Sequence, residues 1–282
     1  SSAASDVYKR QMTLGAAAKV MLTVTDSTRK GYDMEYTFLE FVSDDQIKSE
    51  AQNLVGQVMD ILNDATVGTT IRFRTDQCGK IIKYYNLKDI RKQAKDVLTK
   101  AISKMPYADS LRAVGLNPDK LMSMIDSDNL VDGYTEEIEL LFNYHGGQYK
   151  IGETESHEDA TGNEYASDTK TDIWLDPDTY EYGISADVYS HIPREDIKAL
   201  LGNLIEYFTD EESAKDVRKG LDTEFDSQVT TDGVYNSYVR ISYFNDGWPQ
   251  EVVSQDNISL GDRQKLKQKY ITWDYRSVGH SE

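Results

Sequence analysis

The chain has 282 residues, 39% of them hydrophobic, and carries a formal net charge of −18 at pH 7. This length allows one large domain or two medium ones, and so acidic a chain repels the phosphates of nucleic acids and anionic lipid surfaces. No stretch approaches the ~18 consecutive apolar residues that cross a membrane. We therefore expect a globular protein with no nucleic-acid partner and no membrane span.

Alternating strands open the regular part of the chain, after Met12. Residues 19–26 and 32–42 alternate apolar and polar side chains around a turn sequence, which predicts a β-hairpin. Apolar residues then recur every three or four positions over residues 45–62, which predicts an amphipathic helix.

A second hairpin is predicted over residues 69–86, with its turn at Gly79, because glycine readily adopts positive φ. A helix over residues 87–105 follows, with Asn86 as its N-cap. Further helices are predicted over residues 109–115, 117–126 and 131–144.

The C-terminal part begins with strands and polar loops up to residue 190. Helices are predicted over residues 197–208 and 210–220. The pairs Asp232-Gly233 and Asp246-Gly247 are typical of tight hairpin turns. The remaining segments predict an antiparallel meander, with strands over residues 224–230, 234–244, 248–258 and 267–278.

These elements predict an α+β fold: an antiparallel curved sheet of hairpins and a C-terminal meander, with amphipathic helices packed on one face. We expect an N-terminal α+β part over residues 12–146 and a C-terminal α+β part over residues 147–282, and the two parts could share one sheet. The expected core residues are Ile71, Phe73, Ile81, Ile90, Val97, Leu98, Ile173, Leu200, Leu201, Leu204, Ile241 and Tyr243.

The sequence contains no recognisable catalytic or cofactor-binding motif. It lacks the GxSxG, P-loop and GxGxxG patterns, and its four histidines show no metal-ligand spacing. The single cysteine, Cys78, has no histidine near it in the sequence to act as a base, so we interpret it as a turn residue. We therefore predict a non-enzymatic protein with no catalytic residues, no cofactor and no metal site.

An acidic stretch over residues 153–187 holds eleven carboxylates against one lysine, Lys170. Oxygen ligands of this kind bind Ca²⁺ when a loop turns them inward, and Glu158 and Asp159 are the weak candidates. The stretch does not match the EF-hand pattern, so a solvated acidic loop is the preferred interpretation. Carboxylate pairs for glycoside hydrolysis remain open, because their pairing is three-dimensional.

Aromatic residues supply the candidate ligand-binding positions. In the sequence FNDGWPQ, Trp248 can form an exposed platform for a sugar or peptide. Alternatively, it covers the end of the sheet while Pro249 blunts an edge strand, and this interpretation is preferred. Tyr243 and Trp174, from tyrosine-rich strands, complete the candidate ligand-binding set.

Three segments carry a resemblance: the hairpin TTIRFRTDQCGKIIKYYN that runs into a helix, the later FNDGWPQEV, and the closing strand QKYITWDYRSV. Over most of residues 68–278 the chain resembles secreted proteins of unknown function from Bacteroides-type gut bacteria, many of which are lipid-anchored. The resemblance implies an extracytoplasmic location, in the periplasm or at the outer-membrane surface, and brings no catalytic residues with it. Cys78 departs from the Asn or Asp expected at that turn.

The first eleven residues have a different origin in this interpretation. Residues 6–11, Asp-Val-Tyr-Lys-Arg-Gln, are the codon-by-codon translation of GATGTGTATAAGAGACAG, which looks like a transposon end used to prepare sequencing libraries. We therefore expect residues 1–11 to be a non-native, adapter-derived tail and exclude them from fold reasoning. An export signal and a lipid-anchoring cysteine could then precede Met12 in the natural chain.

The preferred function is that of a non-enzymatic extracytoplasmic protein that binds a small hydrophobic, glycan or peptide ligand in a concavity between sheet and helices. A structural or interaction module of an envelope assembly, using an exposed strand edge or the Trp248 corner, is the first alternative. A hydrolase using dispersed carboxylates is the second, and it requires two facing acids with raised pKa values.

Overall fold

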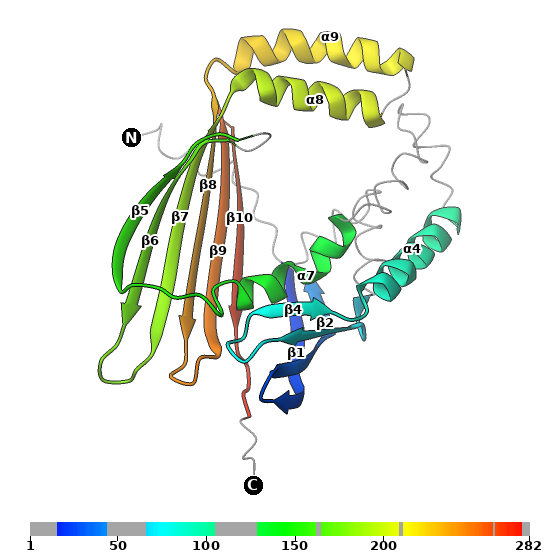
Figure 1. Ribbon diagram of the computed structural model, residues 1–282. Coiled ribbons are helices and arrows are strands. Elements are labelled where there is room, and N and C mark those ends of the chain that lie inside the picture. Colours follow the sequence, from blue (N-terminus) through cyan, green and yellow to red (C-terminus); the bar gives the residue numbers. More distant parts are fainter. Residues whose placement is uncertain are drawn as a thin grey trace, which may run out of the picture. The chain divides into compact units, whose positions relative to one another are not determined.

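The computed structural model describes residues 16–43, 66–104, 129–161, 165–208, 211–261 and 263–277. The described strands form two separate antiparallel sheets, one of four strands and one of six, accompanied by helices (Figure 1). The predicted α+β class is therefore confirmed, with two sheets in place of a shared one. The chain divides into an N-terminal unit (Ser1–Ile138) and a C-terminal unit (Glu139–Glu282), whereas the sequence placed the boundary at residue 146.

The sheet of the N-terminal unit has the strand order β1-β2-β3-β4. Its strands, each antiparallel to the next, are β1 (Ala16–Thr28), β2 (Gly31–Ser43), β3 (Thr70–Thr75) and β4 (Ile81–Tyr84). Both hairpins predicted from the alternating pattern are confirmed. Gly31 begins β2 with a φ of 135°, and a Cβ there would lie 1.9 Å from the carbonyl oxygen of Thr75. Only glycine fits this close approach of two strands.

The core of the N-terminal unit lies on one face of this sheet. Met34, Tyr36 and Phe38 alternate along β2 and are at most 5% exposed. On β3, Ile71 pairs with Tyr36 and Phe73 pairs with Met34, and both β3 residues are fully buried. The period-two pattern of these strands therefore marks the buried face.

Helix α4 (Leu87–Lys104) follows β4 where the sequence predicted it. The carbonyl oxygen of Asn86 accepts a first-turn hydrogen bond from the N–H of Ile90 at 3.1 Å. The Asn86 side chain does not cap the helix, however: its Oδ1 accepts from the N–H of Arg72 at 2.9 Å, and its Nδ2 donates to the carbonyl of Thr70 at 2.8 Å. Asn86 therefore stands at the N-cap position as predicted, but its side chain bonds to backbone groups of β3 and not to the first turn of the helix.

The remaining N-terminal predictions divide into two groups. The helices predicted over residues 45–62, 109–115 and 117–126 lie outside the described residues. The helix predicted over residues 131–144 is confirmed as α7 (Asn129–Phe142), and Gly146 just beyond it has the φ of 75° that is typical of a C-terminal cap. Among the helices in the described part of the chain, none has the length and apolarity needed to cross a membrane.

The sheet of the C-terminal unit is a meander in which each strand pairs with its sequence neighbours (Figure 1). The turn at Asp246-Gly247 is confirmed, with Gly247 at a φ of 85° and its N–H donating to the carbonyl of Phe244 at 2.9 Å. The strands are β5 (Gly152–Glu158), β6 (Ser167–Leu175), β7 (Tyr182–Ile192), β8 (Gly233–Tyr243), β9 (Pro249–Leu260) and β10 (Arg263–Thr272).

The final strand differs from the prediction of residues 267–278. It begins earlier because Arg263 already pairs with Leu260, directly after the turn at Gly261. The pairing ends at Thr272, opposite Glu251.

The two faces of the C-terminal sheet differ in chemistry. Ile173, Ile184, Ile241 and Val252 are cross-strand partners in one row, and we call their side of the sheet the inner face. The last three of these residues are at most 2% exposed. Side chains alternate across a strand, so the residues between them point to the opposite side, which we call the outer face. The outer face carries mainly polar and charged side chains.

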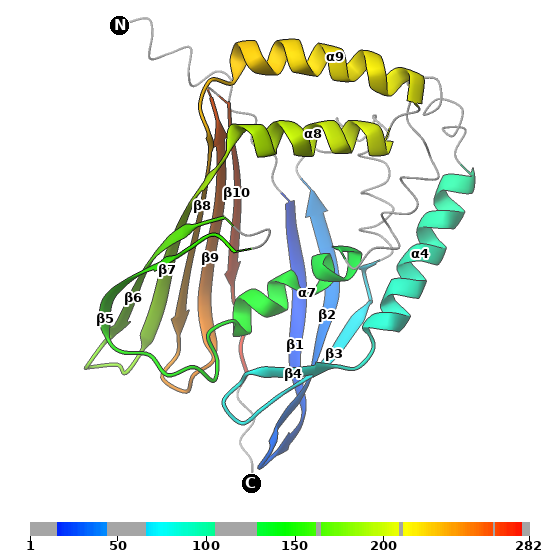
Figure 2. The same cartoon turned by 45° about the horizontal axis from the view of Figure 1, so that its top comes forward.

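Helices α8 (Arg194–Phe208) and α9 (Glu211–Gln228) connect β7 to β8 and lie side by side at one end of the sheet (Figures 1 and 2). Helix α9 is longer than predicted, and the strand predicted over residues 224–230 is wrong, since residues 224–228 are helical. The helix continues because Phe225 is buried, with the guanidinium of Arg194 at 5.2 Å from its ring centroid. This contact holds the last turn of α9 against the start of α8.

Two further predictions in this region are wrong. Asp232-Gly233 does not close a hairpin; it joins α9 to β8, and Asp232 Oδ1 accepts a hydrogen bond from the N–H of Arg194 at 2.9 Å. Leu200 and Leu204, expected in the core, are 59% and 42% exposed, because the described side chains of α9 and of the sheet do not cover the side of α8 that carries them.

The other core predictions are mostly correct. Ile71, Phe73, Ile90, Ile241 and Tyr243 are buried. The residues that are only half-buried are Ile81, Val97, Ile173 and Leu201, and the side chain of Leu98 lies outside the described residues.

Candidate functional site

The three predicted ligand-binding residues do not come together. Tyr243 is on the inner face, where it pairs with Tyr182 of β7, and Trp248 follows it at the β8–β9 turn. Trp174 is on the outer face, because it follows the inward-facing Ile173 in β6. The sheet itself therefore separates Trp174 from Tyr243.

Tyr243 is enclosed in an aromatic cluster. Its side chain is 2% exposed, its ring stacks on Tyr182 at a centroid distance of 4.8 Å, and it meets the ring of His145 at 5.2 Å. Burial raises the pKa of Tyr243, and the neighbouring tyrosines raise it further, so the hydroxyl stays protonated at neutral pH. This hydroxyl has no hydrogen-bond partner among the described residues. A side chain so enclosed stabilises the core and does not reach a ligand at the surface.

Trp248 is half-buried and covers one end of the same cluster. Its indole meets the ring of Phe142 edge to face at a centroid distance of 6.2 Å. The carbonyl oxygen of Gly247 lies 3.1 Å from Nε2 of His145, which holds the turn in place. Pro249 does not blunt an edge strand as expected, since it is buried at the start of β9, between β8 and β10.

Trp174 packs flat against the outer face of the sheet. The absence of a side chain at Gly183 makes room for it, since a Cβ there would lie 2.3 Å from the indole. The guanidinium of Arg240 lies 5.9 Å from the ring centroid, within cation–π range. Trp174 therefore contributes aromatic surface to the outer face.

An open groove of about 530 Å³ crosses the outer face over strands β5 to β8. His157, Asp168, Tyr189 and Asn236 are successive cross-strand partners along it, one from each strand. We call it the polar groove, and its lining residues are Glu155, Ser156, His157, Asp168, Thr169, Lys170, Asp187, Tyr189 and Asn236.

Hydrogen bonds hold the side chains of the polar groove in position. His157 Nδ1 lies 2.7 Å from Asp168 Oδ1. Asn236 Nδ2 donates to Asp187 Oδ1 and, at 3.3 Å, to the carbonyl of Val188. Donors and acceptors are thus fixed at set positions on a rigid sheet.

The groove also pairs basic with acidic side chains: His157 is opposite Asp168, and Lys170 lies between Glu155 and Asp187. The hydrogen bond and the charge of Asp168 raise the pKa of His157, with a smaller contribution from Asp159. The ammonium of Lys170 lies 3.2 Å from a carboxylate oxygen of Glu153, which raises the pKa of that lysine. The groove therefore presents paired acidic and basic side chains, and the amide of Asn236, to a polar ligand.

The weak metal candidates do not form a site. Asp159 Oδ1 lies 3.5 Å from His157 Nε2, whereas Glu158 alternates to the inner face. Within the described ranges, no three His, Cys, Asp or Glu side chains are grouped to hold a metal ion. Cys78 is exposed in the β3–β4 turn, where its N–H donates to Asp76 Oδ1 at 2.8 Å, as predicted for a turn residue.

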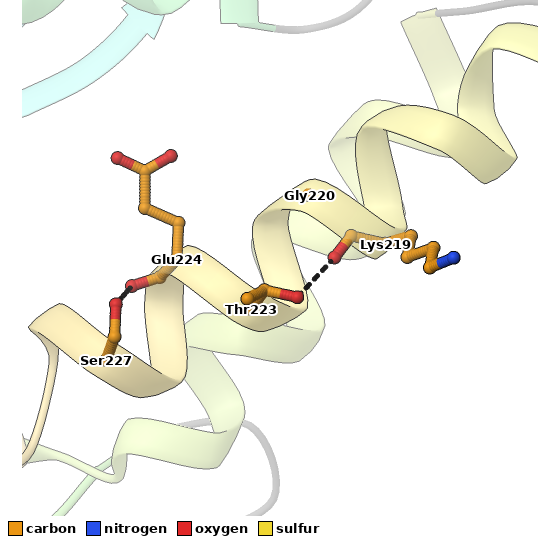
Figure 3. Close-up of a pocket in the computed structure, with 5 residues that line it drawn as sticks. All are labelled: Lys219, Gly220, Thr223, Glu224 and Ser227. Atoms are coloured by element: carbon orange, nitrogen blue, oxygen red, sulfur yellow. Dashed lines mark hydrogen bonds between the residues drawn. The ribbon is translucent and has the colours of Figure 1, made fainter.

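A second depression, of about 520 Å³, lies along helix α9 (Figure 3). The Thr223 hydroxyl donates to the carbonyl of Lys219 at 3.1 Å, and the Ser227 hydroxyl donates to the carbonyl of Glu224 at 2.8 Å. Figure 3 shows the side chains of Lys219 and Glu224 pointing away from each other. Both hydroxyl groups donate their hydrogen bonds to carbonyls of the helix itself and are not available as donors to a ligand, so the polar groove is the better candidate site.

Sequence reasoning identified little of the polar groove. His157 is one of four histidines that show no metal-ligand spacing, and Lys170 is the one lysine in the acidic stretch. Tyr189 and Asn236 lie on strands that α8 and α9 separate in the sequence, so only the β7–β8 register brings them together. The only signal in the sequence that could have indicated the groove was a polar residue at alternate positions of each predicted strand.

Comparisons with known proteins were made for the whole chain. No protein-family model matches it, and searches of curated proteins and of solved structures found no match. The candidate site therefore rests on its geometry, and the resemblance to secreted Bacteroides-type proteins stays an expectation.

Proposed function

We propose that this chain is a non-enzymatic binding protein of the cell envelope and that the polar groove binds a glycan. The extracytoplasmic location is supported by the resemblance of residues 68–278 to secreted proteins. The sequence-based hypothesis placed the ligand between sheet and helices; the proposal moves it to the outer face, where the groove lies.

The row of His157, Asp168, Tyr189 and Asn236 carries the proposal. A sugar ring offers several hydroxyl groups that both donate and accept hydrogen bonds, and one apolar ring face. The imidazole, the carboxylate and the amide match the hydroxyls, and the Tyr189 ring, 40% exposed, matches the apolar face.

The same chemistry argues against a small hydrophobic ligand. Such a ligand would remove water from Asp168, Lys170 and Asn236 without replacing its hydrogen bonds, at a cost of about 1–3 kcal/mol for each group. An open groove covers only one side of its ligand, so we expect modest affinity for an oligosaccharide.

A glycan array probed with the folded 282-residue chain tests the proposal, followed by titration calorimetry with the best oligosaccharide. Asn236→Ala and His157→Ala each remove one hydrogen-bonding group and should weaken binding about tenfold, the equivalent of one hydrogen bond of about 1.4 kcal/mol. Thr223→Ala is the matched control, because it removes a hydroxyl from the depression on α9 and should leave binding unchanged.

Two results would contradict the proposal. The first is a folded protein that binds no glycan on the array. The second is glycan binding that both groove variants retain at full strength, which would place the ligand elsewhere.

The hydrolase alternative finds no support at the carboxylates whose pKa is shifted. Backbone hydrogen bonds from Asp178 and Thr179 lower the pKa of Asp176, and the hydrogen bond from Lys198 lowers the pKa of Asp226. A general acid needs the opposite shift. Incubating the protein with the glycans that it binds and analysing the products by mass spectrometry tests this alternative directly.

A further inference from the structure

The C-terminal sheet has an open strand at each edge within the described residues. β10 pairs only with β9, and β5 pairs only with β6 (Figure 1). The ten residues of β10 pair with β9 without a register shift and include no proline. The other side of β10 therefore presents an uninterrupted row of backbone N–H and C=O groups, which is a template for a further strand.

The two edges carry opposite charges. β10 has four basic residues and no acidic one: Arg263, Lys265, Lys267 and Lys269. β5 has three acidic residues and no lysine or arginine: Glu153, Glu155 and Glu158. A basic edge strand is unusual in a chain with a net charge of −18. Like charges opposite each other oppose pairing, so β10 repels a second β10 and attracts an acidic strand.

Apolar side chains lie exposed along the basic edge. Leu266 and Tyr270, on the outer face of β10, are 42% and 63% exposed. Lysine on an edge strand also protects a sheet against aggregation, but this protection does not require large apolar side chains beside it. A strand added next to β10 would cover both, because cross-strand neighbours lie about 5 Å apart.

From these observations we propose that β10 of one copy of this chain pairs with β5 of a second copy. The strands alternate in direction from β5 to β10, so these two edges run in opposite directions. A second copy in the same orientation therefore continues the antiparallel sheet. In this arrangement Glu158 lies on the face that carries Lys265, and Glu155 lies on the face that carries Leu266 and Tyr270.

The contact is head-to-tail, because it joins two different edges. Each added copy leaves one basic and one acidic edge open, so association gives open-ended oligomers and not a closed dimer. The net charge of −18 opposes the approach of two copies, so we expect association at high protein concentration. The inference does not rest on glycan binding.

Sedimentation velocity of the full chain, at concentrations up to about 1 mM, tests the proposal. The wild-type chain should form oligomers whose size grows with concentration. The variant Lys265→Glu/Lys269→Glu lowers the net charge of β10 from +4 to 0. The variant Glu155→Lys/Glu158→Lys changes the net charge of β5 from −3 to +1. Each should weaken association about tenfold, because the attraction between the two edges is lost. The quadruple variant restores opposite charges at positions 158 and 265, which share a face, and should regain association.

The quadruple variant shows whether the parent variants lose the contact or fail to fold, since a misfolded chain does not regain association. A wild-type chain that stays monomeric up to about 1 mM overturns the proposal, and so does a quadruple variant that stays as weak as its parents. A third outcome also overturns the proposal: the wild-type chain stays monomeric but binds a synthetic Glu-rich peptide, and Lys265→Glu/Lys269→Glu does not bind it. In that case the partner of β10 is a strand from another protein and not a second copy of this chain. Glycan binding by Lys265→Glu/Lys269→Glu should be unchanged, which keeps this test apart from that of the polar groove.

Discussion

Replacing Tyr243 with phenylalanine should stabilise the C-terminal unit. The Tyr243 side chain is 2% exposed, and its hydroxyl has no hydrogen-bond partner among the described residues. In the unfolded chain the same hydroxyl is hydrated by water. Folding therefore removes its hydrogen bonds without replacing them, and the substitution Tyr243→Phe removes that cost.

The size of the effect follows from the cost of burying an unsatisfied hydroxyl, about 1–3 kcal/mol. The ring stays in place against Tyr182 and His145, so no cavity is created. We expect the free energy of unfolding to rise by about 1–2 kcal/mol, which corresponds to roughly 2–4 °C in Tm for each kcal/mol in a unit of this size.

Urea denaturation followed by tryptophan fluorescence measures this change selectively. All three tryptophans of the chain, Trp174, Trp248 and Trp273, lie in the C-terminal unit. The midpoint should move to higher urea with an unchanged slope.

Tyr36 provides the matched control, because it is equally buried but its hydroxyl donates to Glu137 Oε2 at 2.8 Å. The substitution Tyr36→Phe should destabilise the N-terminal unit by about 1.5–3 kcal/mol, the range for a hydrogen bond to a charged group. This unit has no tryptophan, so its unfolding is the part of the far-UV circular dichroism change that the tryptophan signal of the C-terminal unit does not follow. If Tyr243→Phe destabilises its unit as Tyr36→Phe does, the Tyr243 hydroxyl has a partner, such as a bound water, and the reasoning fails.

Two further predictions concern the outer face. Gly183→Ala should destabilise the C-terminal unit by about 1–3 kcal/mol and shift the emission of Trp174 to the red, because the new Cβ displaces the indole into water. Gly220, a glycine inside α9 with open space around it, is the control, and Gly220→Ala should stabilise the unit by about 0.5–1 kcal/mol. Equal effects of the two substitutions in a thermal melt would contradict the packing argument. The pKa of His157 should lie above its ordinary value, so that the pair with Asp168 is intact at acidic pH and is lost as the pH rises through the raised pKa. Asp168→Asn should lower the pKa of His157 in an NMR titration, and an unchanged value would show that the pair does not form in solution.

Local patterns predicted the elements of this fold well where one face of an element is buried. The alternation of Met34, Tyr36 and Phe38 identified a strand and its buried face before any pairing was known. The sequence does not predict the end of α9, because the short stretch around Phe225 alternates as a strand does, whereas the burial of Phe225 and its contact with Arg194 favour the helix. Tertiary packing here outweighs the local pattern.

The candidate site was less predictable, because it depends on the register between strands that are distant in the sequence. The sequence placed Trp174 with Tyr243 on aromatic character alone, although the inward-facing Ile173 beside it already implies the opposite face. No local pattern pairs Tyr189 with Asn236, since that pairing requires the β7–β8 register. Residue type indicates which side chains can bind a ligand, but strand order and register determine which of them lie next to one another.

The helical pair α8–α9 also determines how the C-terminal sheet must assemble. Ile192 and Gly233 are cross-strand partners, so the chain leaves the sheet after β7 and returns to it at the same position on β8. Closing the loop of roughly 40 residues between them costs about 2 kcal/mol more entropy than closing a four-residue turn. The other neighbouring pairs in this sheet are joined by short connections, whose described residues include no helix. The unit therefore consists of two low-contact-order halves, β5–β7 and β8–β10, and their docking across the β7–β8 seam should limit the folding rate.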